Sequence, residues 1–116
     1  MLDATVDYAK QRTQFGRVIG SYQAIKHKLA DVHITIELAR PLVHGAALSL
    51  QPRDVSAAKV AAGGAARLAA RSALQTHGAI GFTQEHDLSL WLLRVQVLRS
   101  AWGTPEVHRR RVLEAL

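Results

Sequence analysis

The sequence predicts an all-α fold: an antiparallel four-helix bundle with a short first helix, formed as a single domain over residues 1–116. Three observations predict it. Apolar side chains recur every three or four residues, which is the spacing of one helix face. No stretch alternates apolar and polar residues as a half-buried strand does. Proline and glycine signals fall between the periodic stretches, at Gln51-Pro52, Gly78 and Gly103, where turns between helices are expected.

Two helices are expected in the N-terminal half. The segment before Arg12 is the tail of a first helix, with Val6 and Ala9 on its inner face. A long second helix is expected over residues 21–49. Its apolar stripe consists of Ile25, Leu29, Val32, Ile36 and Val43.

Two more helices are expected after a turn at residues 50–53. Asp54 is expected to cap the third helix, because its carboxylate can accept hydrogen bonds from the free amides of the first turn. That helix, residues 55–76, is rich in alanine and contains Gly63-Gly64. Each interior glycine costs about 1 kcal/mol, so the pair predicts that a neighbouring helix or a ligand approaches the backbone there. The fourth helix is expected over residues 85–101.

Composition limits the classes of partner and chemistry. Fifteen Lys and Arg against nine Asp and Glu give a net charge of +6, which favours phosphates, coenzyme A, nucleic acid or acidic lipid as partners. The chain has no cysteine, which excludes disulfides, thiolate metal sites and cysteine nucleophiles and fits a cytoplasmic protein. No apolar run approaches the roughly 18–20 residues that span a bilayer, so no membrane association is expected.

The first candidate motif is Arg12-Thr13-Gln14-Phe15-Gly16. Arg12 offers a planar set of donors suited to phosphate oxygens, and Gly16 lets the backbone turn closely around a ligand. Phe15 can pack beneath a planar base. The alternative is an amphipathic helix that ends in a basic turn, with Phe15 in the core.

The second motif is Gln75-Thr76-His77-Gly78-Ala79-Ile80-Gly81-Phe82-Thr83-Gln84-Glu85. Gln75 can donate and accept hydrogen bonds at once. Backbone amides at the glycine turn, near the start of the next helix, suit an anion. The alternative is a helix C-cap followed by a loop.

In this order, with an alanine-rich helix between them, the two motifs resemble the C-terminal domain of the acyl-CoA dehydrogenases. The family pattern is R-x-x-F-G, a helix, then Q-x-x-G-G-x-G-F-x-x-E, and the resemblance runs from about Tyr8 to about Arg111. It implies FAD as cofactor, an acyl-CoA thioester as substrate and α,β-dehydrogenation as the reaction. It also implies a homo- or hetero-oligomer, a dimer or tetramer, with this domain at its centre.

The resemblance also implies the cofactor contacts. Arg12 would contact the pyrophosphate of FAD with Phe15 beside it, and Tyr22 and Gln23 would approach the adenosine end. Residues 75–79 would line the FAD of the neighbouring subunit, although Ala79 replaces the second family glycine. The chain would return to the cofactor after Gly103. The implied residues are Arg12, Phe15, Tyr22, Gln23, Gln75, Thr76, His77, Gly78, Ala79, Thr104 and Glu106.

No catalytic residue is assigned. Many family members carry the glutamate that removes the substrate's α-proton at the position of Trp102, and indole has no basic lone pair. The base would come either from a helix before residue 1 or from the other subunit of a heteromer. Glu106 is the nearest carboxylate but lies beyond the turn. Family members also carry an N-terminal helical and a middle β domain, so the 116-residue chain is predicted to be inactive alone.

Two other functions remain open. The chain can be a non-catalytic subunit or interaction module that keeps the bundle without a redox step. It can also be a basic helical nucleic-acid binder, which the lack of a helix-turn-helix pattern or basic stripe disfavours. His33 and Glu37 lie four residues apart, but no H-E-x-x-H motif accompanies them, so no metal site is expected.

Overall fold

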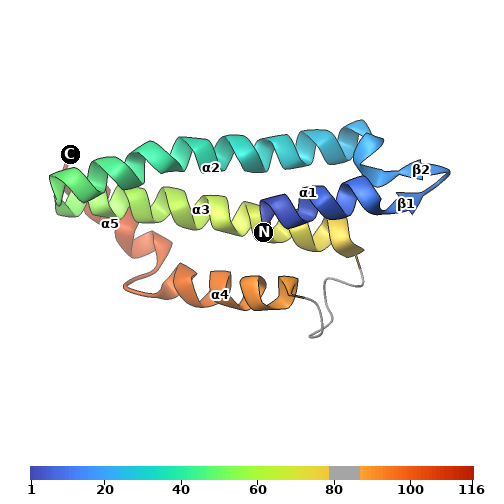
Figure 1. Cartoon of the computed structure of the whole chain (residues 1–116). Helices are drawn as coiled ribbons and strands as arrows, with labels where there is room; N and C mark the ends of the chain where they lie inside the picture. The colour runs from blue at the N-terminus through green and yellow to red at the C-terminus, as the bar shows by residue number, and fades with distance from the viewer. Residues whose placement is uncertain (79–86) are drawn as a thin grey trace.

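The computed structural model describes residues 1–78 and 87–116. Within these ranges the chain forms five α-helices, a two-stranded hairpin and, at Ile19–Ser21, a 3-10 turn. Helices α1 to α4 run alternately in opposite directions (Figure 1), which confirms the predicted antiparallel bundle with a short first helix. The elements are α1 (Leu2–Gln11), β1 (Thr13–Gln14), β2 (Arg17–Val18), α2 (Gln23–Ser49), α3 (Pro52–His77), α4 (Leu88–Ser100) and α5 (Pro105–Glu114).

The interface between α2 and α3 is the most extensive in the bundle. Its buried residues are small and regularly spaced, every seven residues on α2 and every four on α3. They are Val32, Ala39, Ala46, Ala65, Ala69 and Ala73. Small side chains let two helices approach closely, but each buries little apolar area. The core is therefore thin, in a molecule that measures 54 × 27 × 20 Å.

The start of α3 differs from the expectation. The helix begins at Pro52 with Gln51 as its N-cap, so the prediction that Asp54 caps it is wrong. Proline at the first helical position has its φ angle already fixed and has no N–H that needs an acceptor. Asp54 lies in the first turn instead, where Arg53 Nε donates to its carboxylate at 3.1 Å.

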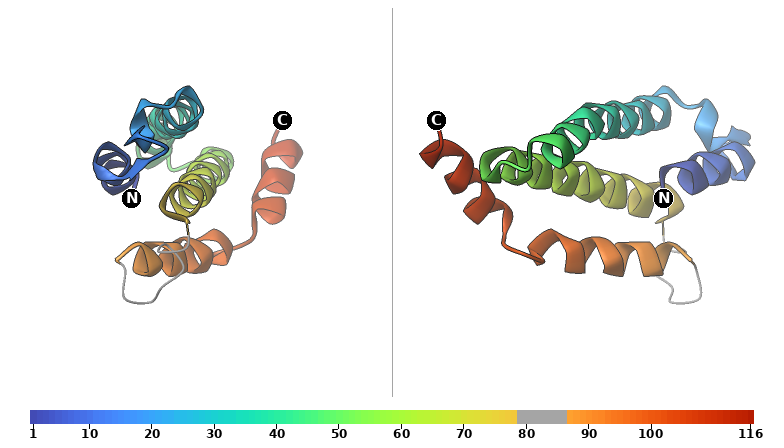
Figure 2. Two further views of the ribbon diagram at one scale, coloured as in Figure 1. Left: turned by 90° about the vertical axis from the view of Figure 1, so that its right-hand side faces the viewer. Right: turned by 60° about the vertical axis from the view of Figure 1, so that its left-hand side comes forward.

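Helix α5 is not among the helices that the sequence predicts. In the structure α5 leaves the bundle axis at an angle (Figure 2) and packs against α3. His108 is only 4% exposed, and its Nδ1 lies 3.1 Å from the Ser56 hydroxyl oxygen. A histidine thus occupies the buried position of α5 that an apolar residue would normally mark.

The glycine pair in α3 faces open space. An added Cβ at Gly63 or at Gly64 would meet no heavy atom within 4 Å. The expected close approach of a neighbouring helix is therefore not made by the described part of this chain.

We predict that Gly64→Ala raises the free energy of unfolding by about 1 kcal/mol, because alanine is the better helix former and the methyl group has room. Urea denaturation followed by circular dichroism measures this. The matched control is Gly20→Ala, whose Cβ would lie 2.9 Å from the Ala9 carbonyl oxygen and should destabilise the chain. A loss of stability for Gly64→Ala would mean that another surface packs on this face in solution.

Candidate functional site

The Arg12–Gly16 motif forms a tight hairpin rather than the end of a helix. Strands β1 and β2 pair antiparallel, with Gln14 opposite Arg17. The two turn residues both have positive φ, 54° at Phe15 and 82° at Gly16. These angles match a type I′ turn, whose twist suits a two-residue hairpin. Strands of two residues are too short to show an alternating pattern, so no strand was expected here.

Phe15 projects from the tip of this hairpin and is 92% exposed. The alternative that placed Phe15 in the core is therefore wrong. A bulky residue at positive φ is strained by about 1–3 kcal/mol, and exposure of its ring adds a further cost in water. A strained, exposed aromatic side chain is typical of a residue that contacts another molecule.

Tyr22 holds the hairpin in place. Its hydroxyl lies 3.3 Å from the Gln14 carbonyl oxygen and 3.4 Å from that of Phe15, and it can donate to either. The Arg17 guanidinium carbon lies 3.9 Å from the centre of the Tyr22 ring, which is a cation–π contact. The side chain of Tyr22 therefore positions Phe15. The neighbouring Gln23 is exposed at the first residue of α2.

We predict that Phe15→Asn raises the free energy of unfolding by about 0.5–1 kcal/mol, because asparagine tolerates the left-handed conformation better. Gly16→Ala serves as control and should lower it by a similar amount, since its φ of 82° is unfavourable for alanine. Thermal unfolding measures both. Destabilisation by Phe15→Asn would show that the phenyl ring packs on this chain.

Arg12 ends α1 and begins the hairpin. Its N–H donates to the Tyr8 carbonyl at 2.9 Å, and its own carbonyl accepts from the Ile19 N–H at 2.8 Å. The backbone is thus fixed while the side chain remains exposed. Among residues 1–78 and 87–116, no carboxylate forms an ion pair with it. Arg12 therefore presents an uncompensated positive charge at the base of the hairpin whose tip carries Phe15.

The end of α3 divides the second motif into exposed and buried residues. Gln75 is exposed, and its Oε1 accepts a hydrogen bond from Lys28 on α2. Thr76 is buried and donates to the Ser72 carbonyl at 2.7 Å. Gly78 follows the helix with φ 63°. Ala79, with the rest of the motif to Glu85, lies outside the described residues.

The side chain of His77 belongs to the interface between α1 and α3. It is 5% exposed, its Nδ1 is hydrogen-bonded to the Ala73 carbonyl at 2.9 Å, and its ring stacks on Tyr8 with centroids 4.3 Å apart. Arg12 lies one helical turn beyond Tyr8. This packing places the hairpin and the end of α3 at the same end of the bundle (Figure 1). The first motif and the described start of the second, about sixty residues apart in sequence, therefore lie at the same end of the bundle.

The turn between α4 and α5 lies toward the other end of the bundle (Figure 1). Trp102 has φ 60° and is 81% exposed, and Gly103 has φ 119°. The Lys59 ammonium lies 5.7 Å from the centre of the Trp102 ring and also donates to the Leu98 carbonyl. Lys59 thus fastens the end of α4 to α3. This contact of Lys59 could not be predicted, because a single lysine in the alanine-rich helix does not indicate which residues it meets in the fold.

Thr104 and Glu106 start α5, with Thr104 as the N-cap. The pKa of Glu106 is lowered, first by a hydrogen bond from its own backbone N–H, then by one from Thr104 and by the charges of Arg109 and Arg99. Glu106 also forms an ion pair with Arg109 at 3.6 Å. A carboxylate held in its ionised form in this way is a weak proton acceptor, so Glu106 is a poor substitute for the missing base.

The described ranges also bear on the metal and membrane expectations. Within residues 1–78 and 87–116, no three His, Asp or Glu side chains gather as a group that could hold a metal ion. In the same ranges, no helix combines the length and the hydropathy needed to cross a bilayer.

Known proteins match this chain over nearly its whole length. A family model, "Acyl-CoA dehydrogenase, C-terminal domain", covers residues 1–116. Acyl-CoA dehydrogenase IpdE2 of Mycobacterium tuberculosis is 44% identical over 110 residues, which are 94% of this chain and 35% of that protein. Butyryl-CoA dehydrogenase from Megasphaera elsdenii has a TM-score of 0.91 at 33% identity, covering 98% of this chain and 31% of that one. The ChsE4-ChsE5 complex from Mycobacterium tuberculosis gives 0.91 at 30% identity, with 97% and 32% covered.

The helical bundle and these matches define the C-terminal helical domain of a dehydrogenase. The chain belongs to the acyl-CoA dehydrogenase family, a family of flavoprotein oxidoreductases. The resemblance seen in the two motifs is thereby confirmed. The chain spans about a third of the length of the relatives that it matches.

Proposed function

We propose that this chain is the FAD-contacting and oligomerising part of a cytoplasmic FAD-dependent acyl-CoA dehydrogenase, which in its complete form dehydrogenates an acyl-CoA thioester between its α and β carbons. The observation that carries the proposal is the hairpin end, where Arg12 is exposed without an acidic partner among the described residues and Phe15 is 92% exposed. Free donors beside an exposed aromatic ring suit a phosphate-bearing, planar cofactor.

The hairpin end has the groups that such a cofactor needs. Arg12 would neutralise pyrophosphate charge, and Phe15 would pack against a planar ring. Gln75, oriented by Lys28, would donate and accept hydrogen bonds. Bound FAD would supply the acceptor for the hydride that leaves the β-carbon. Because Thr76 and His77 are buried, contact from this part of the motif would rest on Gln75 and on backbone groups near Gly78.

The positions of the proposed contacts support sharing of the cofactor between subunits. The proposed contacts Thr104 and Glu106 lie at the start of α5, where His108 is hydrogen-bonded to Ser56 of α3. Ser56 and Gln75 are 19 residues apart on α3. That is about 28 Å at 1.5 Å per residue. Thr104 and Glu106 therefore lie far from Arg12 and Gln75 within one chain. A second subunit in the opposite orientation would bring its hairpin end to the α4–α5 turn.

Exposed apolar faces support the oligomer. On α2, Ile34, Leu38 and Leu42 repeat every four residues and are 53%, 67% and 47% exposed. On α4, Leu90 and Leu93 are each 65% exposed. Exposed leucines and isoleucines at helical spacing are typical of an interface. The relative solved as the ChsE4-ChsE5 complex is itself an assembly. Partner chains identical to this one or different from it both fit these faces.

The base must come from elsewhere, because Trp102 cannot accept a proton and Glu106 is a weak acceptor. We predict that the purified 116-residue chain, supplied with FAD, an acyl-CoA and an electron acceptor, shows no turnover. Trp102→Glu alone should also show none, since the acyl-binding domains are contributed by other parts of the protein. A dye-reduction assay measures this, and turnover by the unaltered chain would contradict it.

A non-catalytic subunit is the second candidate, and Trp102 at the usual base position favours it. Such a subunit would keep the bundle and the exposed faces of α2 and α4. The two candidates differ in whether the assembled protein binds flavin. An assembly that binds FAD at a ratio of one per chain supports the first, and a colourless assembly of the complete protein supports the second.

A further inference from the structure

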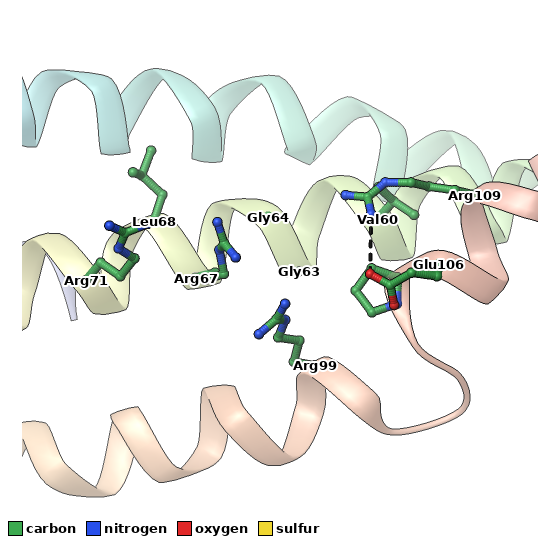
Figure 3. Close-up of a pocket in the computed structure, with 10 residues that line it drawn as sticks. Val60, Gly63, Gly64, Arg67, Leu68, Arg71, Arg99, Glu106 and Arg109 are labelled. Carbon is green, nitrogen blue, oxygen red and sulfur yellow. Dashed lines mark ion pairs between the residues drawn. The ribbon is translucent and has the colours of Figure 1, made fainter.

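A cavity of about 290 Å³ lies between α3, α4 and α5, on the side of α3 that faces α4 (Figure 3). Each of the three helices contributes arginine to it. Arg67 and Arg71 come from α3, Arg99 points from α4 toward α3, and Arg109 comes from α5. None of these arginines belongs to the proposed flavin contacts. Among the residues that line the cavity, Glu106 is the one that is also a proposed flavin contact.

The backbone of α3 at Gly63 and Gly64 forms the floor of the cavity. Gly63, Arg67 and Arg71 follow one another at four-residue spacing, so they share one face of α3. At Gly63 and at its neighbour Gly64, an added Cβ would meet no atom within 4 Å. The space that the glycines leave is therefore open, and a ligand can approach the helix backbone beneath the arginine side chains.

The lining carries an excess of positive charge. Its four arginines face a single acidic side chain, Glu106, which leaves three positive charges. Glu106 pairs with Arg109 at 3.6 Å. Within residues 1–78 and 87–116, no carboxylate forms an ion pair with Arg67, Arg71 or Arg99. Like charges brought together without a counter-charge repel one another, so the cavity is arranged to be completed by an anion.

We infer that this cavity binds the phosphate or diphosphate group of a small molecule, with Arg67 and Arg99 as its principal donors and the Gly63-Gly64 backbone as its floor. Guanidinium groups bind phosphate oxygens with paired, charge-assisted hydrogen bonds. A diphosphate carries two to three negative charges, which matches the three uncompensated positive charges better than a single carboxylate does. A cavity bounded by three helices suits a small ligand rather than a polymer.

The test uses the 116-residue chain, with inorganic pyrophosphate and inorganic phosphate as probes. Isothermal titration calorimetry at fixed ionic strength should give one site per chain, with pyrophosphate bound more tightly than phosphate. Arg99→Gln should weaken pyrophosphate binding by about tenfold or more, the effect of losing one charged hydrogen-bond donor. The matched control is Arg110→Gln, which removes the same charge from an exposed position of α5 outside the cavity. It should change the affinity less than about twofold.

A second variant tests the floor. Gly63→Leu places a side chain in the cavity while every arginine is kept, and it should also weaken pyrophosphate binding by about tenfold or more. Circular dichroism shows that each variant remains folded. No binding by the unaltered chain, or equal weakening by Arg99→Gln and Arg110→Gln, would overturn the proposal. Loss of binding in Arg12→Gln with none in Arg99→Gln would place the anion at the hairpin. That result would support the proposed flavin contact and reject this second site.

Discussion

Leu88→Ala is expected to lower the free energy of unfolding by about 2–5 kcal/mol. Leu88 is 1% exposed and is the largest fully buried side chain of the described chain. It begins α4, where it packs at the end of the bundle near Tyr8 and His77. Because the buried residues of the core are mostly alanine, few large neighbours can move to fill the space that its removal leaves. Urea denaturation followed by circular dichroism at 222 nm, the usual helix signal, measures the change.

The same helix offers a matched control. Leu93 is 65% exposed, so Leu93→Ala should change the free energy of unfolding by less than about 0.5 kcal/mol. The difference between the two variants isolates burial from helix propensity, because the substitution is identical. If Leu88→Ala costs no more than Leu93→Ala, α4 does not dock on α3 in solution as described.

Arg12→Gln is expected to reduce the affinity of the complete, assembled protein for FAD by about 10- to 150-fold. A hydrogen bond to a charged group contributes about 1.5–3 kcal/mol, and this range converts to that factor. The free energy of unfolding of the apoprotein should change little, because the Arg12 guanidinium is exposed and forms no ion pair with a described residue. Titration of the apoprotein with FAD, followed by quenching of flavin fluorescence, measures the affinity.

Arg111→Gln is the control for charge alone. Arg111 is exposed in the last turn of α5, and α5 lies away from the hairpin (Figure 1). Its substitution removes the same charge. FAD affinity should then change less than about twofold at physiological ionic strength. Equal losses in the two variants would indicate a general electrostatic effect and would remove Arg12 from the cofactor site.

The long helices could be predicted because their apolar residues repeat at helical spacing. Val32 lies in the expected stripe of α2 and is 1% exposed. Helix α5 could not be predicted in the same way, since its buried position is filled by His108, whose partner Ser56 is 52 residues away. A polar pair whose members meet only in the folded structure leaves no apolar period in the sequence. The hairpin was missed for a related reason, because two residues per strand are too few to show alternation.

The sequence motifs predicted which residues belong to the candidate site, but not which of their side chains are exposed and which are buried. Sequence order alone could not show that Phe15 is exposed at a strained turn, or that His77 stacks on Tyr8 inside the bundle. The glycine pair in α3 predicted a close approach to its backbone, and the described residues leave that backbone open. Its open face became interpretable only when the fold brought Arg99 from α4 beside it.

The most direct test of the central claim is size-exclusion chromatography of this chain mixed with FAD, with light scattering and visible absorbance recorded on the same peak. The claim is that the hairpin end contacts a flavin across a subunit interface. It predicts a dimer or tetramer whose peak carries the flavin spectrum, and loss of the flavin but not of the oligomer in Arg12→Gln. A monomer that retains flavin, or flavin retained equally by Arg12→Gln, would contradict it.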